Sequence, residues 1–331
     1  MERFALAAAV VLGFALTAAL CSLFVPLRRV LERREQNQQP VQSEQPRPAP
    51  LRAPLWGGLC AAAGTVAAVG VGWLVACVGQ PELLGSEGRL MTRLLTALAG
   101  SLAFGAVGLA EALARMRRPA ALGLRRDVRL LLEALAAAFV LLLLQAAGCL
   151  PRGLDVPGAG YVLLGSAVPF LWAVLMVVLA ECARIAERDE GTVCGAAFVA
   201  MLALMMAEAG LGVPGLAVLP AALAGALVAL LLWAFPPARL GVGCCGSLLA
   251  AGAIGCIPLS LDMTSLTVPL ALPFWAAGGL LAAQLLGAKR TGKPLRCWVK
   301  KHKMSPETVF LCSFALSAVG YVLALALLRW C

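Results

Sequence analysis

Three polar stretches of the chain contain residue types that bind ions or phosphates. Glu111 and Arg115 stand four residues apart at the end of an apolar run, Glu187 and Glu190 belong to the sequence ERDEG, and His302 lies in KKHK. Carboxylates hold hard cations such as Mg²⁺, and cationic side chains bind phosphate. Each group also has a plainer interpretation: an ordinary i,i+4 ion pair, a solvated acidic loop, and a basic rim beside a membrane, respectively.

The cysteines favour packing over metal or redox chemistry. The chain has 12 cysteines, most of them inside apolar runs and none paired in the CxxC spacing of zinc sites. Cys244 and Cys245 could form a thiolate pair for a soft metal or a redox switch, but the flanking Gly243 and Gly246 favour close helix packing. Because buried cysteine generally behaves as a small hydrophobic residue, we expect these side chains to pack in the core.

The composition is that of an integral membrane protein. Hydrophobic residues make up 61% of the 331 residues, charged residues make up 13%, and the mean hydropathy is +0.90. A helix needs roughly 20 apolar residues to cross the hydrocarbon region of a bilayer, whereas the strands of a membrane barrel alternate apolar and polar residues. The apolar runs here are continuous, so the sequence predicts an all-α membrane protein.

We expect about ten transmembrane helices in a single polytopic membrane domain that covers residues 1–331. The helix from Gly243 is short and rich in glycine. The ten expected spans are Phe4–Leu27, Leu55–Val78, Met91–Leu113, Val128–Cys149, Gly160–Leu179, Val193–Gly210, Pro214–Trp233, Gly243–Pro258, Leu266–Gly287 and Val309–Leu328.

The distribution of lysine and arginine predicts the orientation. With these spans, 22 of the 27 basic residues fall on one side of the membrane and only Arg3, Arg89, Arg93, Arg152 and Arg329 fall on the other. Cytoplasmic loops carry the excess of positive charge, so both termini are expected outside. The net charge of +10 therefore indicates membrane topology and attraction to anionic lipid rather than nucleic-acid binding. The expected cytoplasmic loops are about 28–54, 114–127, 180–192, 234–242 and 288–308.

Two further glutamates, Glu133 and Glu208, fall within expected spans. An ionisable side chain inside a membrane is costly and is functional by default. Both residues lie near the ends of their spans, however, so we expect them to reach the membrane interface by snorkelling.

Six motifs in the predicted inner loops occur in the same order and on the same face as those of a known family. The chain resembles the polyprenyl-phosphate N-acetylhexosamine-1-phosphate transferases (MraY/WecA type) over nearly its whole length, with most similarity to the phospho-N-acetylmuramoyl-pentapeptide transferase branch. The matching segments are Arg52–Gly58 (TPTMGG), Gly105–Arg118 (GVIGFxDDxxK), Gly123-Leu124 (GL), Ala183–Gly191 (NLTDGLDG), Phe235–Leu248 (YPAxxFMGDxGSL) and Thr291–Lys293 (TGK).

The resemblance implies a reaction and a site. Such enzymes move a sugar phosphate from a UDP-sugar to a polyprenyl phosphate and release UMP, with Mg²⁺ as cofactor, in peptidoglycan and related cell-wall synthesis. It also implies the bacterial plasma membrane, a cytoplasmic active face, and a homodimer or a cell-wall synthesis partner. The implied candidates are Glu111, Glu187 and Glu190 for catalysis, and Arg115, Arg184, Lys300, Lys301 and His302 for substrate phosphate.

The sequence departs from the family at most of the chemical positions. Glu111-Ala112 stands in place of the aspartate pair, Arg115 in place of the lysine, and Cys244 in place of a metal-binding aspartate. A thiol is a poor ligand for Mg²⁺, which prefers hard oxygen donors. We therefore expect a catalytically impaired member, and we assign no metal ligand. The alternatives are an active transferase with a rebuilt glutamate site, which would use Mg²⁺, and a lipid or solute transporter.

Overall fold

The structure is a computed structural model of the whole chain. It describes residues 2–38, 56–79, 88–117, 123–151, 153–156, 160–163, 165, 167–187, 191–212, 215–236, 238–287 and 305–330.

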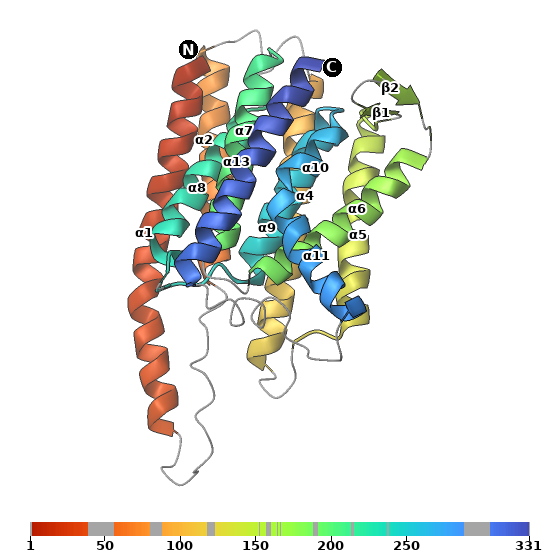
Figure 1. Cartoon of the computed structure of the whole chain (residues 1–331). Coiled ribbons are helices and arrows are strands. Elements are labelled where there is room, and N and C mark those ends of the chain that lie inside the picture. The colour runs from red at the N-terminus through yellow and green to blue at the C-terminus, as the bar shows by residue number, and fades with distance from the viewer. Residues whose placement is uncertain are drawn as a thin grey trace.

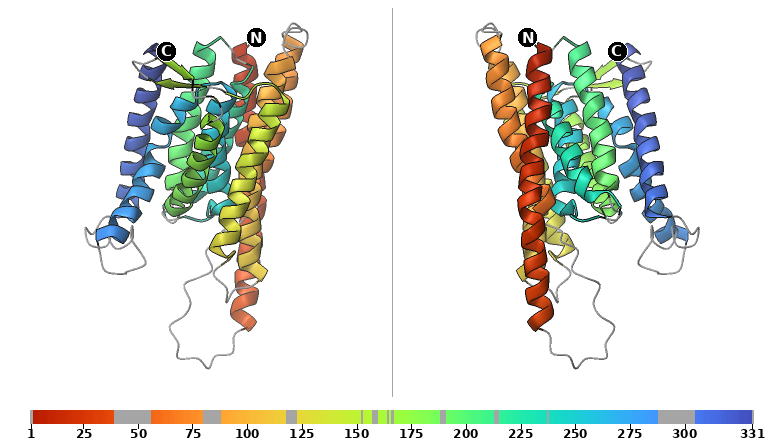
Figure 2. Two further views of the ribbon diagram at one scale, coloured as in Figure 1. Left: turned by 90° about the vertical axis from the view of Figure 1, so that its right-hand side faces the viewer. Right: turned by 90° about the vertical axis from the view of Figure 1, so that its left-hand side faces the viewer.

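The described residues form a bundle of long helices whose axes run roughly in one direction (Figure 1). The two termini lie at the same end of the bundle, and α1 extends beyond the other helices at the opposite end (Figure 2). We call this opposite end, where α4 ends and α5 begins, the α4–α5 end. The main helices are α1 (Glu2–Gln38), α2 (Trp56–Gly79), α4 (Gly88–Arg117), α5 (Arg126–Ala146), α6 (Ala167–Ala186), α7 (Thr192–Gly210), α8 (Val218–Ala234), α9 (Gly243–Ser260), α11 (Leu272–Gly287) and α13 (Pro306–Trp330).

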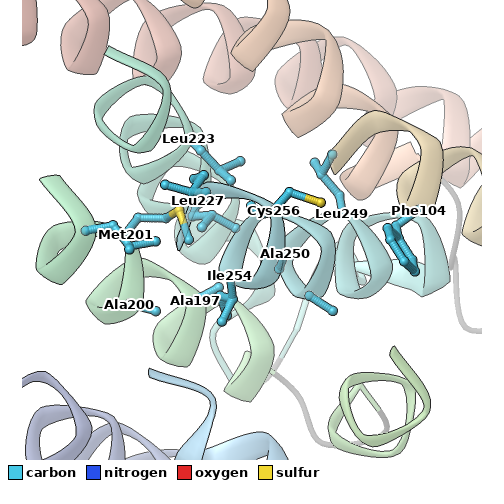
Figure 3. Packing of buried hydrophobic residues seen from close by; sticks show 14 of the residues in the cluster. Phe104, Ala197, Ala200, Met201, Leu223, Leu227, Leu249, Ala250, Ile254 and Cys256 are labelled. Atoms are coloured by element: carbon cyan, nitrogen blue, oxygen red, sulfur yellow. The ribbon is translucent and has the colours of Figure 1, made fainter. Parts of the chain in front are cut away.

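Helix α9 is the centre of the bundle. All 18 of its residues are buried, and it packs against α2, α4, α6 and α7. Its sequence, GCCGSLLAAGAIGCIPLS, is dominated by small residues, which allow helix backbones to approach closely. Figure 3 shows the result: Ile254 of α9 lies beside Ala197 and Ala200 of α7, and Leu249 lies on the side that faces Phe104 of α4.

Two glycines set how closely the neighbouring helices approach α9. A Cβ atom added at Gly108 of α4 would lie 2.2 Å from the backbone oxygen of Cys244, and one added at Gly58 of α2 would lie 2.1 Å from the backbone nitrogen of Gly246. Real Cβ atoms do not approach backbone atoms this closely, so only glycine fits at these crossings. The contact at Gly108 holds α4 against the first turn of α9.

The predicted all-α membrane fold is confirmed. Of the described helices, seven are long and apolar enough to cross a membrane, and α8 is a shorter apolar helix. The protein is therefore a multi-pass membrane protein. Each of the ten predicted segments overlaps one of the ten main helices, although α5 carries four charged residues in its first eight positions and α11 has only 16 residues. The number of spans and their orientation remain predictions.

Two predicted spans have different local structures from those expected. Residues Gly160–Leu163, expected to begin a helix, form strand β2, which pairs antiparallel with β1 (Gly153–Val156) at the same end of the bundle as the termini. Gly160 has a φ of +70°, a left-handed conformation that interrupts a right-handed helix. Helix α6 therefore starts only at Ala167.

The segment expected as one helix from Leu266 to Gly287 is broken into a 3₁₀ turn (Thr264–Leu266), the short α10 (Thr267–Leu270) and α11. Pro273 has no N–H to donate to the carbonyl of Pro269, and its ring would collide with that carbonyl in a continuous helix. Proline is tolerated in the first turn of a helix, which is where α11 places it.

Candidate functional site

The functional candidates gather at the α4–α5 end, where three helices bring charged side chains together. Glu111 and Arg115 come from the last turns of α4, Arg129 and Glu133 from the start of α5, and Glu181 and Arg184 from the end of α6. We call these six residues the Arg–Glu cluster. The turn after α6 adds Glu187, and the first turn of α9 adds Cys244.

Arg129 is the central cation of the cluster. Its Nε donates to Glu181 Oε1 at 2.8 Å, its Nη1 lies 3.6 Å from Glu111 Oε1, and its Nε lies 4.0 Å from Glu133 Oε1. The Arg129 side chain is only 9% exposed. One guanidinium group therefore interacts with carboxylates from three helices and links α4, α5 and α6. Glu181 also accepts a hydrogen bond from Arg184, its neighbour one turn later.

Arg115 forms the predicted ion pair with Glu111, with Nη2 donating to Oε1 at 2.5 Å. Glu111 is buried, whereas the side chain of Arg115 is 36% exposed, so Arg115 faces the open side of the cluster. Gly123 packs against it: a Cβ atom there would lie 3.0 Å from both Cγ and Nε of Arg115, and the residue has a φ of +97°. A side chain at position 123 would therefore crowd Arg115.

Glu187 and Cys244 form a second contact beside the cluster. The thiol of Cys244 donates to Glu187 Oε2 at 3.1 Å, and Glu187 interacts electrostatically with Arg115 and Arg184. Burial raises the pKa of the Glu187 carboxyl above its ordinary value, and the hydrogen bond from Cys244 opposes that rise. Glu187 is therefore part of a structured contact rather than of a solvated loop.

The donors of this site do not fit a magnesium ion. Mg²⁺ needs oxygen ligands at about 2.0–2.1 Å in near-octahedral geometry. In the part of the chain that the structure describes, no three His, Cys, Asp or Glu side chains are grouped so that they could hold a metal. Glu111 and Glu181 are engaged by guanidinium groups, and Glu187 accepts from a thiol. Ten cysteines, Cys244 and Cys245 among them, are free thiols.

The predicted site residues are brought together only in part. The structure unites Glu111, Arg115, Arg184 and Glu187. Glu190, Lys300, Lys301 and His302 lie outside the described residues.

Sequence reasoning missed Arg129 and Glu181 and misjudged Glu133. The side chain of Glu133 is 0% exposed and that of Glu208 is 1% exposed, so the expectation that they reach the membrane interface is wrong. A signal was present in the helical spacing, because Arg129 and Glu133 are four residues apart and Glu181 and Arg184 are three apart. The spacing does not indicate, however, that the pair on α5 contacts the pair on α6.

This charged site therefore lies at one end of a multi-pass helical membrane bundle. A family model described as glycosyl transferase family 4 matches residues 94–262, which contain the whole Arg–Glu cluster, Glu187 and Cys244. The chain belongs to this family, and the resemblance noted in the sequence is confirmed.

Three relatives, each named phospho-N-acetylmuramoyl-pentapeptide-transferase, show the level of similarity. The protein from Mycobacterium tuberculosis strain H37Rv is 27% identical over 265 residues, which cover 72% of each chain. That from Desulforudis audaxviator is 33% identical over 170 residues, covering 48% of this chain and 50% of its own. That from Synechococcus sp. RCC307 is 32% identical over 185 residues, covering 54% and 47%, respectively.

Proposed function

We propose that this protein is a divergent, catalytically impaired member of family 4 that binds a polyprenyl phosphate or a UDP-sugar at the α4–α5 end. The observation that carries the proposal is the engagement of the carboxylates. Glu111 accepts a hydrogen bond from Arg115, Glu181 from Arg129 and Glu187 from Cys244, so a metal ion would have to compete with these donors for the carboxylates. A transferase that relies on a metal to stabilise phosphoryl charge loses most of that stabilisation without it.

The names of the relatives support a role in peptidoglycan or polyprenyl-phosphate glycolipid synthesis. The excess of basic residues in the predicted inner loops supports a site on the cytoplasmic face of the bacterial plasma membrane. A soluble UDP-sugar would meet positive potential there, and the lipid phosphate would reach the site from the bilayer. A second copy of the chain or a cell-wall synthesis protein would be the partner.

The test is UMP release by the purified protein. It is given undecaprenyl phosphate, UDP-MurNAc-pentapeptide or UDP-GlcNAc, and Mg²⁺ or Mn²⁺, and a phospho-N-acetylmuramoyl-pentapeptide-transferase such as the M. tuberculosis relative is assayed in parallel. We expect no turnover above background while the relative is active. Metal-dependent UMP release by this protein would contradict the proposal that it is catalytically impaired.

One observation favours a second candidate, an active transferase with a rebuilt carboxylate site. Glu111 Oε2 is buried without a hydrogen-bond partner, and the raised pKa of Glu187 suits a proton acceptor. If turnover is found, replacing Glu111, Glu187 and Glu190 by alanine tests this candidate. Loss of turnover in the triple variant would support it, and unchanged turnover would exclude these residues.

A further inference from the structure

The site that does not fit a magnesium ion contains positively charged side chains among its carboxylates. Three guanidinium groups from α4, α5 and α6 lie among the carboxylates of the cluster, and Arg115 interacts electrostatically with both Glu111 and Glu187. A divalent cation bound between α4 and the first turn of α9 would have to compete with Arg115 for the same carboxylates. Arginine keeps its charge at all relevant pH values, so it is a permanent competitor.

The arginines of the cluster differ in how much of each side chain is exposed to solvent. Arg129 is 9% exposed and lies within 4.0 Å of three carboxylates, so it is not available to a ligand. Arg115 is 36% exposed and uses one nitrogen, Nη2, in its bond to Glu111. A guanidinium group carries five N–H donors in a planar fork that matches phosphate oxygens. Arg115 can therefore hold Glu111 and a ligand phosphate at the same time.

The neighbouring Arg184 adds a second donor on the same side. Its side chain is 16% exposed, and its Nε is buried without a hydrogen-bond partner. A buried N–H without an acceptor is costly, and a phosphate oxygen would satisfy it. Arg115 and Arg184 come from different helices and both interact electrostatically with Glu187. The two side chains therefore form the cationic face of the cluster.

We propose that Arg115, with Arg129 behind it and Arg184 beside it, replaces the divalent cation at this site, so that a ligand phosphate binds without metal. This inference rests on the proposed function, which supplies the phosphate ligands. It goes beyond that function because it states which groups neutralise the phosphate when the ligand binds: arginine side chains rather than a metal ion. It applies whether or not the protein has catalytic activity. The shared ligand chemistry is a phosphate group, from either a UDP-sugar or a polyprenyl phosphate.

The experiment measures binding of UDP-GlcNAc, UDP-MurNAc-pentapeptide and undecaprenyl phosphate to the full-length protein in nanodiscs, in EDTA and in excess Mg²⁺. At least one probe is expected to bind with affinities that agree within roughly twofold between the two conditions. Arg115→Ala is expected to weaken that binding by about tenfold or more, because it removes charge-assisted hydrogen bonds to the phosphate. Arg126→Ala is the matched control, because Arg126 is an exposed arginine at the same α4–α5 end, in the first turn of α5.

The probes distinguish the source of the phosphate. Weakened binding of the nucleotide sugars alone assigns the site to the diphosphate, and weakened binding of undecaprenyl phosphate alone assigns it to the lipid. A loss of affinity of about tenfold in EDTA would overturn the proposal, as would an Arg115→Ala variant that binds like Arg126→Ala. Failure of every probe to bind in either condition would overturn it as well.

A direct metal measurement needs no ligand and no activity. Manganese titration followed by electron paramagnetic resonance is expected to detect no bound Mn²⁺ in the natural protein. The variant Cys244→Asp combined with Arg115→Gln supplies a hard oxygen ligand and removes the competing cation, and it is expected to bind Mn²⁺. Stoichiometric Mn²⁺ on the natural protein would contradict the inference. These readouts are independent of UMP release, so failure of the inference is distinguishable from failure of the proposed function.

Discussion

At the residue scale, the site depends on whether each buried charge has a partner. Arg129 contacts Glu111, Glu133 and Glu181, whereas both carboxyl oxygens of Glu133 lack a hydrogen bond. Removing one member of a buried ionic group costs more than the group contributes as a whole, because the remaining charge is left desolvated. Within the Arg–Glu cluster, Arg129 is therefore the residue whose removal is expected to destabilise the fold most.

We predict that Arg129→Ala lowers the free energy of unfolding by about 3–5 kcal/mol, because it leaves two buried carboxylates and a partly buried one without their shared cation. The measurement is the unfolding midpoint in mixed micelles. Arg126→Ala, on the exposed side of the same helix, is expected to change the free energy by no more than about 0.5 kcal/mol.

A second substitution separates charge from packing. If repulsion among carboxylates is the cause, Glu133→Gln should recover part of the stability lost in Arg129→Ala. An additive double variant would instead show that Arg129 acts mainly through the packing of its side chain.

Glu187 gives the site a pH dependence of defined sign. Its folded-state pKa is raised above the ordinary value of 4.5, chiefly by burial. The folded protein then binds the proton more tightly than the unfolded chain, so its stability falls as the pH rises from 4.5 through the folded-state pKa. Glu187→Gln removes this dependence.

The prediction is that the unfolding midpoint falls less steeply between pH 4.5 and neutrality in Glu187→Gln than in the natural protein. Glu307→Gln, at the exposed start of α13, is the control for loss of one carboxylate. Equal slopes in the natural protein and Glu187→Gln would mean that Glu187 is not the buried proton site described here.

At the element scale, the spacing between α4 and α9 decides whether Glu111, Glu187 and Cys244 meet. Gly108 lies one turn before Glu111, and its missing side chain lets the two helices touch backbone to backbone. We predict that Gly108→Ala destabilises the protein by about 1–3 kcal/mol, because the new methyl group collides with the backbone of Cys244. Unfolding in mixed micelles measures this effect.

Gly70→Ala on α2 is the matched control, since nothing lies within 4 Å of a Cβ atom at that position. It should be neutral or stabilising by up to about 1 kcal/mol, because alanine is the better helix former. Equal changes in stability in the two variants would show that a collision between the new methyl group and α9 is not what Gly108→Ala costs.

The helices were largely predictable, and the reasons for the exceptions are local. The apolar runs gave α2, α4, α7 and α9 within a few residues, because length and hydropathy decide where a chain crosses a bilayer. The hairpin at Gly153–Leu163 and the break before α11 depend on the backbone conformation at Gly160 and on the missing N–H of Pro273. Hydropathy averages over such positions and does not register them.

At the scale of the whole molecule, the site was predictable as a list of residues but not as a constellation. The motifs indicated Glu111, Arg115, Arg184 and Glu187, and the structure brings these four together from α4, α6 and the turn after α6. Their roles in binding or catalysis stay a prediction. The role of Arg129 depends on α5 packing between those helices, and this is tertiary information. The sequence showed Cys244 at a metal-ligand position, but only the structure shows its thiol bonded to Glu187.

The last prediction concerns orientation. Figure 1 places both termini at one end of the bundle, and the predicted basic loops favour that end as the outside. Alkaline phosphatase is active only outside the cytoplasm. Fused after the full chain or after Gly79 at the end of α2, it is expected to be active. Fused after Gln38 of α1 or Arg117 of α4, it is expected to be inactive, because an odd number of spans precedes each junction. Activity in the fusions after Gln38 and Arg117 would instead place the Arg–Glu cluster outside the cytoplasm. A soluble UDP-sugar could not reach it there, so this result would contradict the proposed function.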